Sequence, residues 1–288
     1  MTYIIFDCDP TLFYSDLDVD DSLALGYAFR KFKGEVELAG VTTVFGNNSA
    51  DLTYRDARRL AEVAGLDLPV LKGAESRFQL GQPTPAAEFI VETAREYGEI
   101  ELLATGPLTN IATALTLDED VIDAVRRITI MGGAVFVPGN VKYADAEFNF
   151  WSDPQAAKIV IEKMRNIVLV PLDVTTTVRW TEKTLEPLKE SEDELARFLY
   201  EAALPWARRW PQGFHPHDVL AAVYILRPDI YEPEEVKVGV ETEEPRQGKI
   251  TLNKEGKRLL MLRKVNSSKL LEEYYSAFGT AFYDANNK

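Results

Sequence analysis

The sequence is poor in cysteine and histidine, which argues against two common kinds of structural site. Among 288 residues it has one cysteine, Cys8, and two histidines, His215 and His217. A single cysteine excludes disulfide bonds within the chain and favours a reducing compartment, so we expect a cytoplasmic protein. Two histidines in one tripeptide argue against a zinc site built from several imidazoles.

Long apolar runs and an excess of positive charge are also absent. No apolar run approaches the roughly 20 residues that a membrane-spanning helix needs. The N-terminus enters a strand-like run at once, without the basic segment of a signal peptide. The formal net charge of −14 disfavours nucleic acids and anionic membranes as partners. We therefore expect a small molecule as the partner, with no membrane and no nucleic acid.

Short runs rich in β-branched residues alternate with amphipathic stretches through most of the chain. This alternation predicts an α/β fold, with an open, mostly parallel sheet and helices on both of its faces. Pro107 is expected in the first turn of one helix. Further helices are predicted over about 22–32, 50–64, 86–97, 153–164 and 268–278.

The stretch from Val236 to Val265 has a different character, because polar turns separate its short apolar runs. This pattern predicts antiparallel hairpins near the C-terminus. The sequence shows no internal repeat and no linker. We therefore expect residues 1–288 to form a single domain, with the hairpins as a small appendage to it.

Six carboxylates crowd the segment "DCDPTLFYSDLDVDDS", which follows the first strand-like run. Crowded carboxylates repel one another unless a cation lies among them, and Ca²⁺ with its six to eight oxygen ligands suits such a cluster. The segment therefore favours either a phosphatase or a glycosidic-bond hydrolase with a Ca²⁺ loop. The six residues are Asp7, Asp9, Asp16, Asp18, Asp20 and Asp21.

The phosphatase interpretation rests on the pattern D-x-D-x-T, formed by Asp7, Asp9 and Thr11. In that class Asp7 would be the nucleophile and Asp9 the general acid–base, with Mg²⁺ as the metal. The class commonly has a later Gly-Asp motif for Mg²⁺. No Gly-Asp dipeptide occurs in this chain, so the match ends with its first motif.

Glycine-containing and polar motifs also follow other predicted strands. They are Gly46-Asn47-Asn48, Thr105-Gly106 and Met131-Gly132-Gly133. Ligands of open α/β sheets bind outside the carboxyl ends of the strands. We therefore expect these motifs to meet Asp7 and Asp9 at one edge of the sheet.

Taken together, the motifs resemble the nucleoside hydrolase family, the inosine–uridine type of nucleoside N-ribohydrolase. The resemblance implies Ca²⁺-dependent hydrolysis of the N-glycosidic bond of ribonucleosides, which releases a free base and ribose. It also implies a homodimer or homotetramer. The segments that carry it are "DCDP…VDDSLAL", "GVTTVFGN", "LLATGPLTNIA", "IMGGA", "GN…AEFNFWSDPQAA" and "HDVLAA".

The resemblance assigns a role to each matching residue. It implies that Ca²⁺ is held by Asp9, Asp21, Asp218 and the carbonyl of Thr105. Asp9 would also be the general base toward a Ca²⁺-bound water, Asp7 would support the loop from behind, and His217 would lie near the leaving base. The ribose hydroxyls would be bound by Asp20, Asn47, Asn140, Glu147, Asn149 and Asp218.

The segment "LPWARRWPQGFHPHD" offers groups that could contact the base. Trp206 and Trp210 could stack on it, and Arg208, Arg209 and Gln212 could bind a pyrimidine carbonyl. Both kinds of contact are available. We expect a preference for pyrimidine nucleosides or a broad specificity.

The sequence departs from the family in its first motif, which usually reads D-x-D-P-G-x-D-D. Here "TLFYSDLD", Thr11 to Asp18, stands where the family has one glycine. The insertion could bulge outward and leave Asp20 and Asp21 in place, or its apolar side chains could cover the pocket. We favour the first. If the insertion broke the loop, the alternatives would be a non-catalytic riboside binder or an enzyme with another riboside as substrate.

Overall fold

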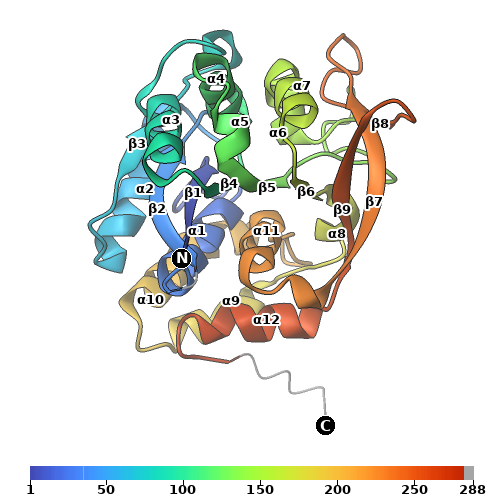
Figure 1. The fold of residues 1–288 in the computed structure, drawn as a ribbon. Helices are drawn as coiled ribbons and strands as arrows, with labels where there is room; N and C mark the ends of the chain where they lie inside the picture. Colours follow the sequence, from blue (N-terminus) through green and yellow to red (C-terminus); the bar gives the residue numbers. More distant parts are fainter. Residues whose placement is uncertain (35, 282–288) are drawn as a thin grey trace.

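The computed structural model describes residues 1–34 and 36–281, and its strands build one continuous sheet (Figure 1). The strands are β1 (Thr2–Cys8), β2 (Val36–Thr43), β3 (Val70–Lys72), β4 (Ile100–Ala104), β5 (Val125–Met131), β6 (Ile167–Val170), β7 (Tyr231–Val240), β8 (Ile250–Leu252) and β9 (Lys257–Val265). Their order across the sheet is β3-β2-β1-β4-β5-β6-β9-β7-β8.

Neighbouring strands from β3 through β9 run parallel, and β7 runs antiparallel to both β9 and β8. The predicted open, mostly parallel α/β sheet with antiparallel C-terminal strands is therefore confirmed. The hairpins are not an appendage, however. Val168 and Leu169 of β6 pair with Leu260 and Met261 of β9, so β9 extends the main sheet. Leu259 and Met261 are buried in the core, which explains why this segment joins the sheet.

Helices cover both faces of the sheet, as Figure 1 shows. They are α1 (Asp20–Lys31), α2 (Ala50–Ala64), α3 (Pro85–Tyr97), α4 (Thr109–Leu117), α5 (Val121–Ala124), α6 (Phe148–Ser152), α7 (Pro154–Lys163), α8 (Leu172–Thr175), α9 (Glu182–Lys189), α10 (Glu194–Arg209), α11 (His217–Leu226) and α12 (Ser267–Ser276), with short 3₁₀ turns η1 (Arg77–Gln79) and η2 (Pro228–Ile230).

The core consists of two apolar layers, one on each face. Because side chains alternate along a strand, Ile4 and Phe6 of β1 point into one layer and Ile5 points into the other. The layer with Ile5 packs against α3, α4 and α7. The layer with Ile4 and Phe6 packs against α1, α2, α10, α11 and α12. The parallel strands are thus buried on both faces, as the doubly covered fold requires.

The predicted position of Pro107 is wrong, because α4 begins two residues later, at Thr109. Gly106 and Pro107 instead belong to the loop that packs against Asp9 and Gly46. A Cβ atom on Gly46 would lie 3.0 Å from the Cδ of Pro107, and one on Gly106 would lie 2.7 Å from the Oδ1 of Asp9. These close approaches hold the loop at the edge of the sheet, so the helix starts only after it.

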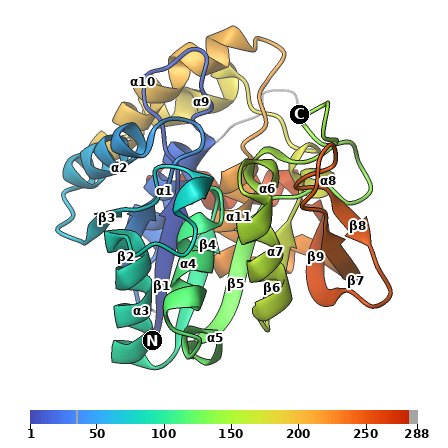
Figure 2. The same ribbon diagram turned by 90° about the horizontal axis from the view of Figure 1, so that it is seen from above.

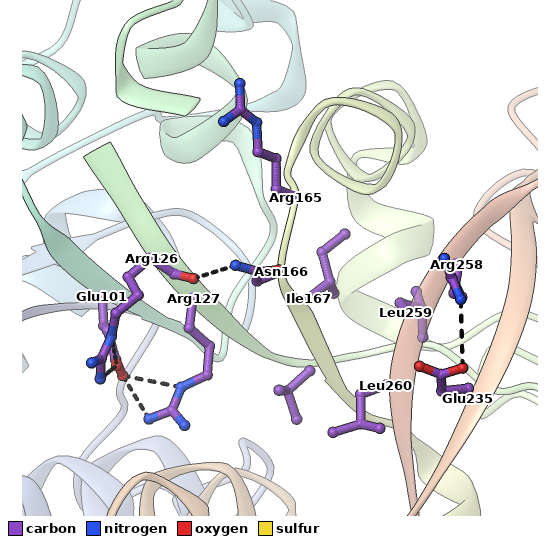
Figure 3. Close-up of a pocket in the computed structure, with 11 residues that line it drawn as sticks. Glu101, Arg126, Arg127, Arg165, Asn166, Ile167, Glu235, Arg258, Leu259 and Leu260 are labelled. Carbon is purple, nitrogen blue, oxygen red and sulfur yellow. Dashed lines mark hydrogen bonds and ion pairs between the residues drawn. The ribbon is translucent and has the colours of Figure 1, made fainter. Parts of the chain in front are cut away.

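A buried ion-pair cluster lies at the opposite edge, where the parallel strands begin (Figure 3). Glu101 of β4 is 1% exposed and accepts hydrogen bonds from Arg126 and Arg127 of β5. The Arg127 pair measures 2.7 Å. These residues line a cavity of about 580 Å³, where Arg258 also pairs with Glu235. Guanidinium groups make burial of the Glu101 carboxylate tolerable, and the pairs connect β4 to β5.

We predict that Glu101→Ala lowers the free energy of unfolding by about 3 kcal/mol, because it leaves two guanidinium groups without their buried carboxylate. Arg126 is half-exposed and keeps water, so the loss lies at the low end for broken buried pairs. Urea denaturation would measure it. The matched control is Glu99→Ala, whose exposed side chain pairs with Arg126 only at 3.8 Å and whose removal should cost less than about 0.5 kcal/mol. Equal losses for the two variants would contradict the assignment.

Candidate active site

The carboxyl ends of the parallel strands gather polar side chains from distant parts of the chain. In Figure 2 the N-terminus lies at the lower edge, so β1 and its parallel neighbours run upward toward α6 and α8. A cavity of about 110 Å³, the acidic cavity, lies at this end. Its walls are Asp18, Asp20, Asp21, Asn47, Thr105, Met131, Asn140, Glu147, Phe148, Asn149, His217 and Asp218.

Asp9 is fully buried and does not line this cavity, but it contacts two residues that do, Asn47 and Asp21. Its Oδ2 accepts a hydrogen bond from the backbone N–H of Asn47 at 2.5 Å, and its own N–H donates to the Oδ1 of Asp21 at 3.3 Å. Gly46 and Gly106 flank the carboxylate so closely that Cβ atoms there would lie 2.1 and 2.7 Å from its oxygens. The Asp9 carboxylate is therefore fixed in position, and its Oδ1 has no hydrogen-bond partner in the described structure.

Asp7 is also buried, and its carboxylate contacts β2 and α4. Its Oδ1 accepts hydrogen bonds from the Thr42 hydroxyl at 2.5 Å and from the Asn110 side-chain amide at 2.8 Å. Burial raises the pKa of Asp7 to about 7. The phosphatase interpretation requires Asp7 to face the substrate, but its carboxylate is bound by Thr42 and Asn110 and it does not line the acidic cavity. The role of Asn110 was not predicted from the sequence, because it is one polar residue in an apolar helical pattern.

Three buried carboxylates form the centre of the site. One oxygen each of Asp20, Asp21 and Asp218 lies within 4.8 Å of the other two. Burial raises the pKa of Asp20 and Asp218 well above the ordinary value, and it raises that of Asp21 to about 6. No lysine or arginine lines the acidic cavity among the residues that the structure describes. A hard divalent cation fits this donor set, because it supplies the missing positive charge and prefers oxygen ligands.

The residues predicted to hold the cation converge only in part. Asp21 and Asp218 lie in the carboxylate cluster, and Thr105 donates its hydroxyl to the Oδ1 of Asp21 at 2.6 Å. The Thr105 carbonyl accepts the Asn149 side-chain amide at 2.7 Å and keeps a second lone pair. Asp20, predicted as a ribose ligand, also belongs to the cluster and accepts the N–H of Asp218 at 3.2 Å.

The other predicted ribose ligands also line the acidic cavity, and two of them, Glu147 and Asn149, are held by backbone groups. The Glu147 carboxylate caps α6 by accepting the N–H groups of Asn149 at 2.8 Å and Phe150 at 3.1 Å, and it also accepts that of Gly133. The side-chain NH₂ group of Asn149 donates to the carbonyls of Thr105 and Met131, so its side-chain oxygen is available to a ligand. These fixed groups offer acceptor oxygens that suit the hydroxyls of a polyhydroxylated ligand.

A second cavity of about 390 Å³, the aromatic cavity, lies beside the first. Trp206 of α10 and Trp210, which directly follows α10, form an edge-to-face pair there, with ring centroids 5.8 Å apart. The predicted base contact Gln212 is present, whereas Arg209 is not among the lining residues and Arg208 pairs with Glu182. The walls are Asp18, Arg179, Trp206, Trp210, Gln212, Gly213, Phe214, His215 and His217.

His217 opens α11 and lines both cavities. Its Nδ1 lies 2.6 Å from the hydroxyl oxygen of Thr175. Burial, together with the neighbouring His215, lowers the pKa of His217 to about 3. The imidazole is therefore neutral near neutral pH. With Nδ1 bound to Thr175, its Nε2 is left to donate or accept a hydrogen bond, according to the tautomer, toward a ligand between the cavities.

Residues 11–17 of the inserted segment pack away from the acidic cavity, and only Asp18 at the end of the segment lines it. The N–H of Leu12 donates to Asp56 of α2 at 3.2 Å, and that of Phe13 donates to the Ala202 carbonyl of α10 at 3.3 Å. The Phe13 ring meets Phe198 edge-on at 5.3 Å. Figure 2 shows the dark blue segment before α1 beside α10. The insertion thus leaves the Asp20 and Asp21 side chains in the acidic cavity.

Three polar lining residues were not predicted as site residues from the sequence. Asp18 reaches both cavities from the end of the insertion, while Arg179 and His215 line only the aromatic cavity. An isolated bridge between Trp180 and Phe214 brings the last two together. Asp18 was visible as one carboxylate of the acidic segment, but no local pattern distinguishes Arg179.

Buried carboxylates and a polar cavity lie together at the carboxyl ends of the strands of an open parallel sheet. This arrangement defines an α/β enzyme with a small-molecule site. The family model "Inosine-uridine preferring nucleoside hydrolase" matches residues 4–272. The chain belongs to this family and is a hydrolase of N-glycosyl bonds. No helix in the described ranges has the length and apolarity to cross a membrane.

Named relatives agree with this assignment. The chain is 32% identical to uridine nucleosidase 1 of Arabidopsis thaliana, over 83% of this chain and 78% of the relative. It is 31% identical to the inosine-uridine preferring nucleoside hydrolase of Crithidia fasciculata, over 86% and 85%. A solved plant nucleoside hydrolase superposes with a TM-score of 0.86 at 25% identity, covering 96% of this chain and 98% of the other.

We predict that Asp21→Ala abolishes cation-dependent stabilisation, because it removes a carboxylate from the centre of the cluster. The wild-type protein should gain about 2.7 kcal/mol of stability at a Ca²⁺ concentration 100 times the dissociation constant. Titration calorimetry and thermal unfolding with and without Ca²⁺ would test this. Asp16→Asn, an exposed carboxylate of the insertion, is the matched control and should bind as the wild type does. Unchanged Ca²⁺ affinity in Asp21→Ala would exclude this cluster as the site.

Proposed function

We propose that the enzyme hydrolyses the N-glycosidic bond of ribonucleosides in a Ca²⁺-dependent reaction and releases a free base and ribose. The observation that carries this proposal is the pairing of the two cavities, which share the walls Asp18 and His217. The acidic cavity offers groups that suit ribose hydroxyls, and the aromatic cavity offers flat rings that suit a base.

Ca²⁺ would be held by Asp9, Asp21, Asp218 and the Thr105 carbonyl. The unpartnered Oδ1 of Asp9 and the crowded carboxylates of the cluster support this choice. When bound, Ca²⁺ would neutralise the buried carboxylates and lower the pKa of a water molecule modestly.

Asp9 would act as the general base and accept the proton of the attacking water at its Oδ1. A base is needed because Ca²⁺ acidifies water far less than zinc does. The fixed position of Asp9 between Gly46 and Gly106 supports this role, since proton transfer requires a base at hydrogen-bond distance. Asp7, held by Thr42 and Asn110, would keep the strand end rigid from behind.

The ribose would be oriented by Asp20, Asn47, Asn140, Glu147, Asn149 and Asp218, which line the acidic cavity. Hydrogen bonds to the hydroxyls would hold the anomeric carbon toward the attacking water. Positive charge develops on the sugar in the oxocarbenium-like transition state of glycoside cleavage. A cavity lined by carboxylates and free of lysine and arginine among the described residues would stabilise that charge.

The leaving base would lie in the aromatic cavity, against Trp206 and Trp210 and within reach of Gln212. His217, neutral at the shared wall, would contact the base next to the bond that breaks. The polar groups of this cavity support a preference for pyrimidine nucleosides or a broad specificity. Arg209, which does not line the cavity, is the weakest of the predicted base contacts.

The remaining features of the proposal concern the whole chain. One sheet built from strands along the chain supports a single domain over residues 1–288. A buried, unpaired Cys8 supports a reducing, cytoplasmic location. A homodimer or homotetramer rests on the family resemblance alone.

We predict that ribose release from uridine requires both Ca²⁺ and the Asp9 carboxylate. A chelator should abolish release, and Asp9→Asn should reduce kcat by about 10²- to 10⁴-fold, because the amide cannot accept the proton. A reducing-sugar assay would measure both effects. Asp16→Asn should retain wild-type activity. Release that survives the chelator would contradict the Ca²⁺ requirement, and no release from any nucleoside by a Ca²⁺-binding wild type would favour the riboside-binder alternative.

We further predict that kcat/KM for uridine equals or exceeds kcat/KM for inosine. The reason is that Gln212 and Arg179 can donate hydrogen bonds to pyrimidine carbonyls in the aromatic cavity. Steady-state rates of ribose release from the two nucleosides would decide the point. A strong preference for inosine would contradict it.

A further inference from the structure

The inserted segment brings one additional side chain, Asp18, to the active site. Only Asp18 and His217 line both the acidic and the aromatic cavity, as far as the structure describes the chain. The rest of the insertion packs on α2 and α10. Asp18 therefore has a position that the remainder of its segment does not share.

The Asp18 carboxylate is held in place by its own backbone. Its Oδ1 accepts the N–H of Val19 at 2.8 Å and the N–H of Asp20 at 3.3 Å, just where α1 begins. The Thr11 hydroxyl donates to the Asp18 carbonyl and closes the base of the inserted loop. Both backbone bonds use Oδ1, and the Asp18 side chain also contacts that of Asp20, so Oδ2 is the oxygen without a backbone donor. A fixed carboxylate of this kind is a pre-organised acceptor.

The expected role of Asp18 rests on the proposed function, because it follows from how a nucleoside would occupy the two cavities. A nucleoside with its sugar in the acidic cavity and its base in the aromatic cavity must cross the shared wall. The glycosidic bond then lies between Asp18 and His217. A carboxylate can only accept hydrogen bonds, so Asp18 needs a donor at this junction. The ribose hydroxyls and the base N–H groups are the donors that a nucleoside offers.

We propose that Asp18 is a substrate-binding residue that accepts a hydrogen bond from the nucleoside at the junction of sugar and base. The insertion thereby adds a specificity determinant to the site. A hydrogen bond to a charged acceptor is worth a rate factor of about 10 to 100 in kcat/KM. Nucleosides that lack the donor should not gain this factor.

The test compares Asp18→Asn with the wild type on a set of uridine analogues. Asparagine keeps an oxygen for the N–H groups of Val19 and Asp20, but it presents an NH₂ donor where Oδ2 was. We expect kcat/KM for uridine to fall about 10- to 100-fold. The same substitution should have little effect on the one analogue that lacks the donor. 2′-Deoxyuridine and 5′-deoxyuridine test the sugar hydroxyls, and 3-methyluridine tests the base N–H.

Controls separate this contact from a general effect. Asp16→Asn removes an exposed carboxylate of the same segment and should leave every rate unchanged. The thermal midpoint of Asp18→Asn should match the wild type, because asparagine keeps an acceptor for the N–H groups of Val19 and Asp20. All rates are compared at saturating Ca²⁺, because the Asp18 side chain also contacts Asp20 of the carboxylate cluster. An unchanged kcat/KM for uridine, or an equal loss for all four substrates, would overturn the proposal.

A binding measurement distinguishes failure of this inference from failure of the proposed function. Calorimetry would compare uridine binding to Asp9→Asn and to Asp9→Asn with Asp18→Asn, where turnover is blocked. A dissociation constant raised about tenfold by Asp18→Asn supports the contact even if the wild type cleaves no nucleoside. Cleavage by the wild type with no effect of Asp18→Asn on rate or binding would leave the function standing and refute the contact.

Discussion

The structure depends on one electrostatic constraint, the burial of several carboxylates with no lysine or arginine among them in the described part of the chain. Asp9, Asp20, Asp21 and Asp218 lie together at the carboxyl edge of the sheet. Backbone N–H groups satisfy part of their charge, since those of Asp9, Asn47 and Asp218 each donate to one of these carboxylates. The remaining negative charge is costly in an apo protein, and a bound cation would relieve it. Four carboxylates carry more negative charge than one divalent cation neutralises, and the excess would stabilise a transition state that is positive at the sugar.

Buried charge is compensated differently at the opposite edge of the sheet, where the parallel strands begin. There the buried carboxylate of Glu101 is matched within the protein by Arg126 and Arg127. The sheet thus has one edge whose charges are balanced internally and one whose charges are left for ligands. In a parallel sheet all strand ends of one kind lie at the same edge, so this separation follows from the topology. It also explains why the larger cavity at the balanced edge is not the better candidate for catalysis.

Much of the scaffold could be predicted because its signals are local. The spacing of apolar residues along a strand, or along an amphipathic helix such as α2, shows which face of that element is buried. The place of β9 could not be predicted, since its pairing with β6 joins segments almost 100 residues apart. The carboxylates of the site could be identified because they stand in motifs at strand ends. Arg179 and His215 could not, because the bridge between Trp180 and Phe214 that places them has no local signature.

The insertion shows how a catalytic loop can grow without losing its geometry. Lengthening a loop adds little closure entropy, about 0.6 kcal/mol for each doubling of its length. The cost is offset here by contacts at both ends, because Leu12 is buried against α2 and Asp18 caps the start of α1. Asp20 and Asp21 are positioned by α1 and not by the length of the loop before it. The carboxylate cluster therefore tolerates the added residues, and the last of them lies where sugar and base would meet.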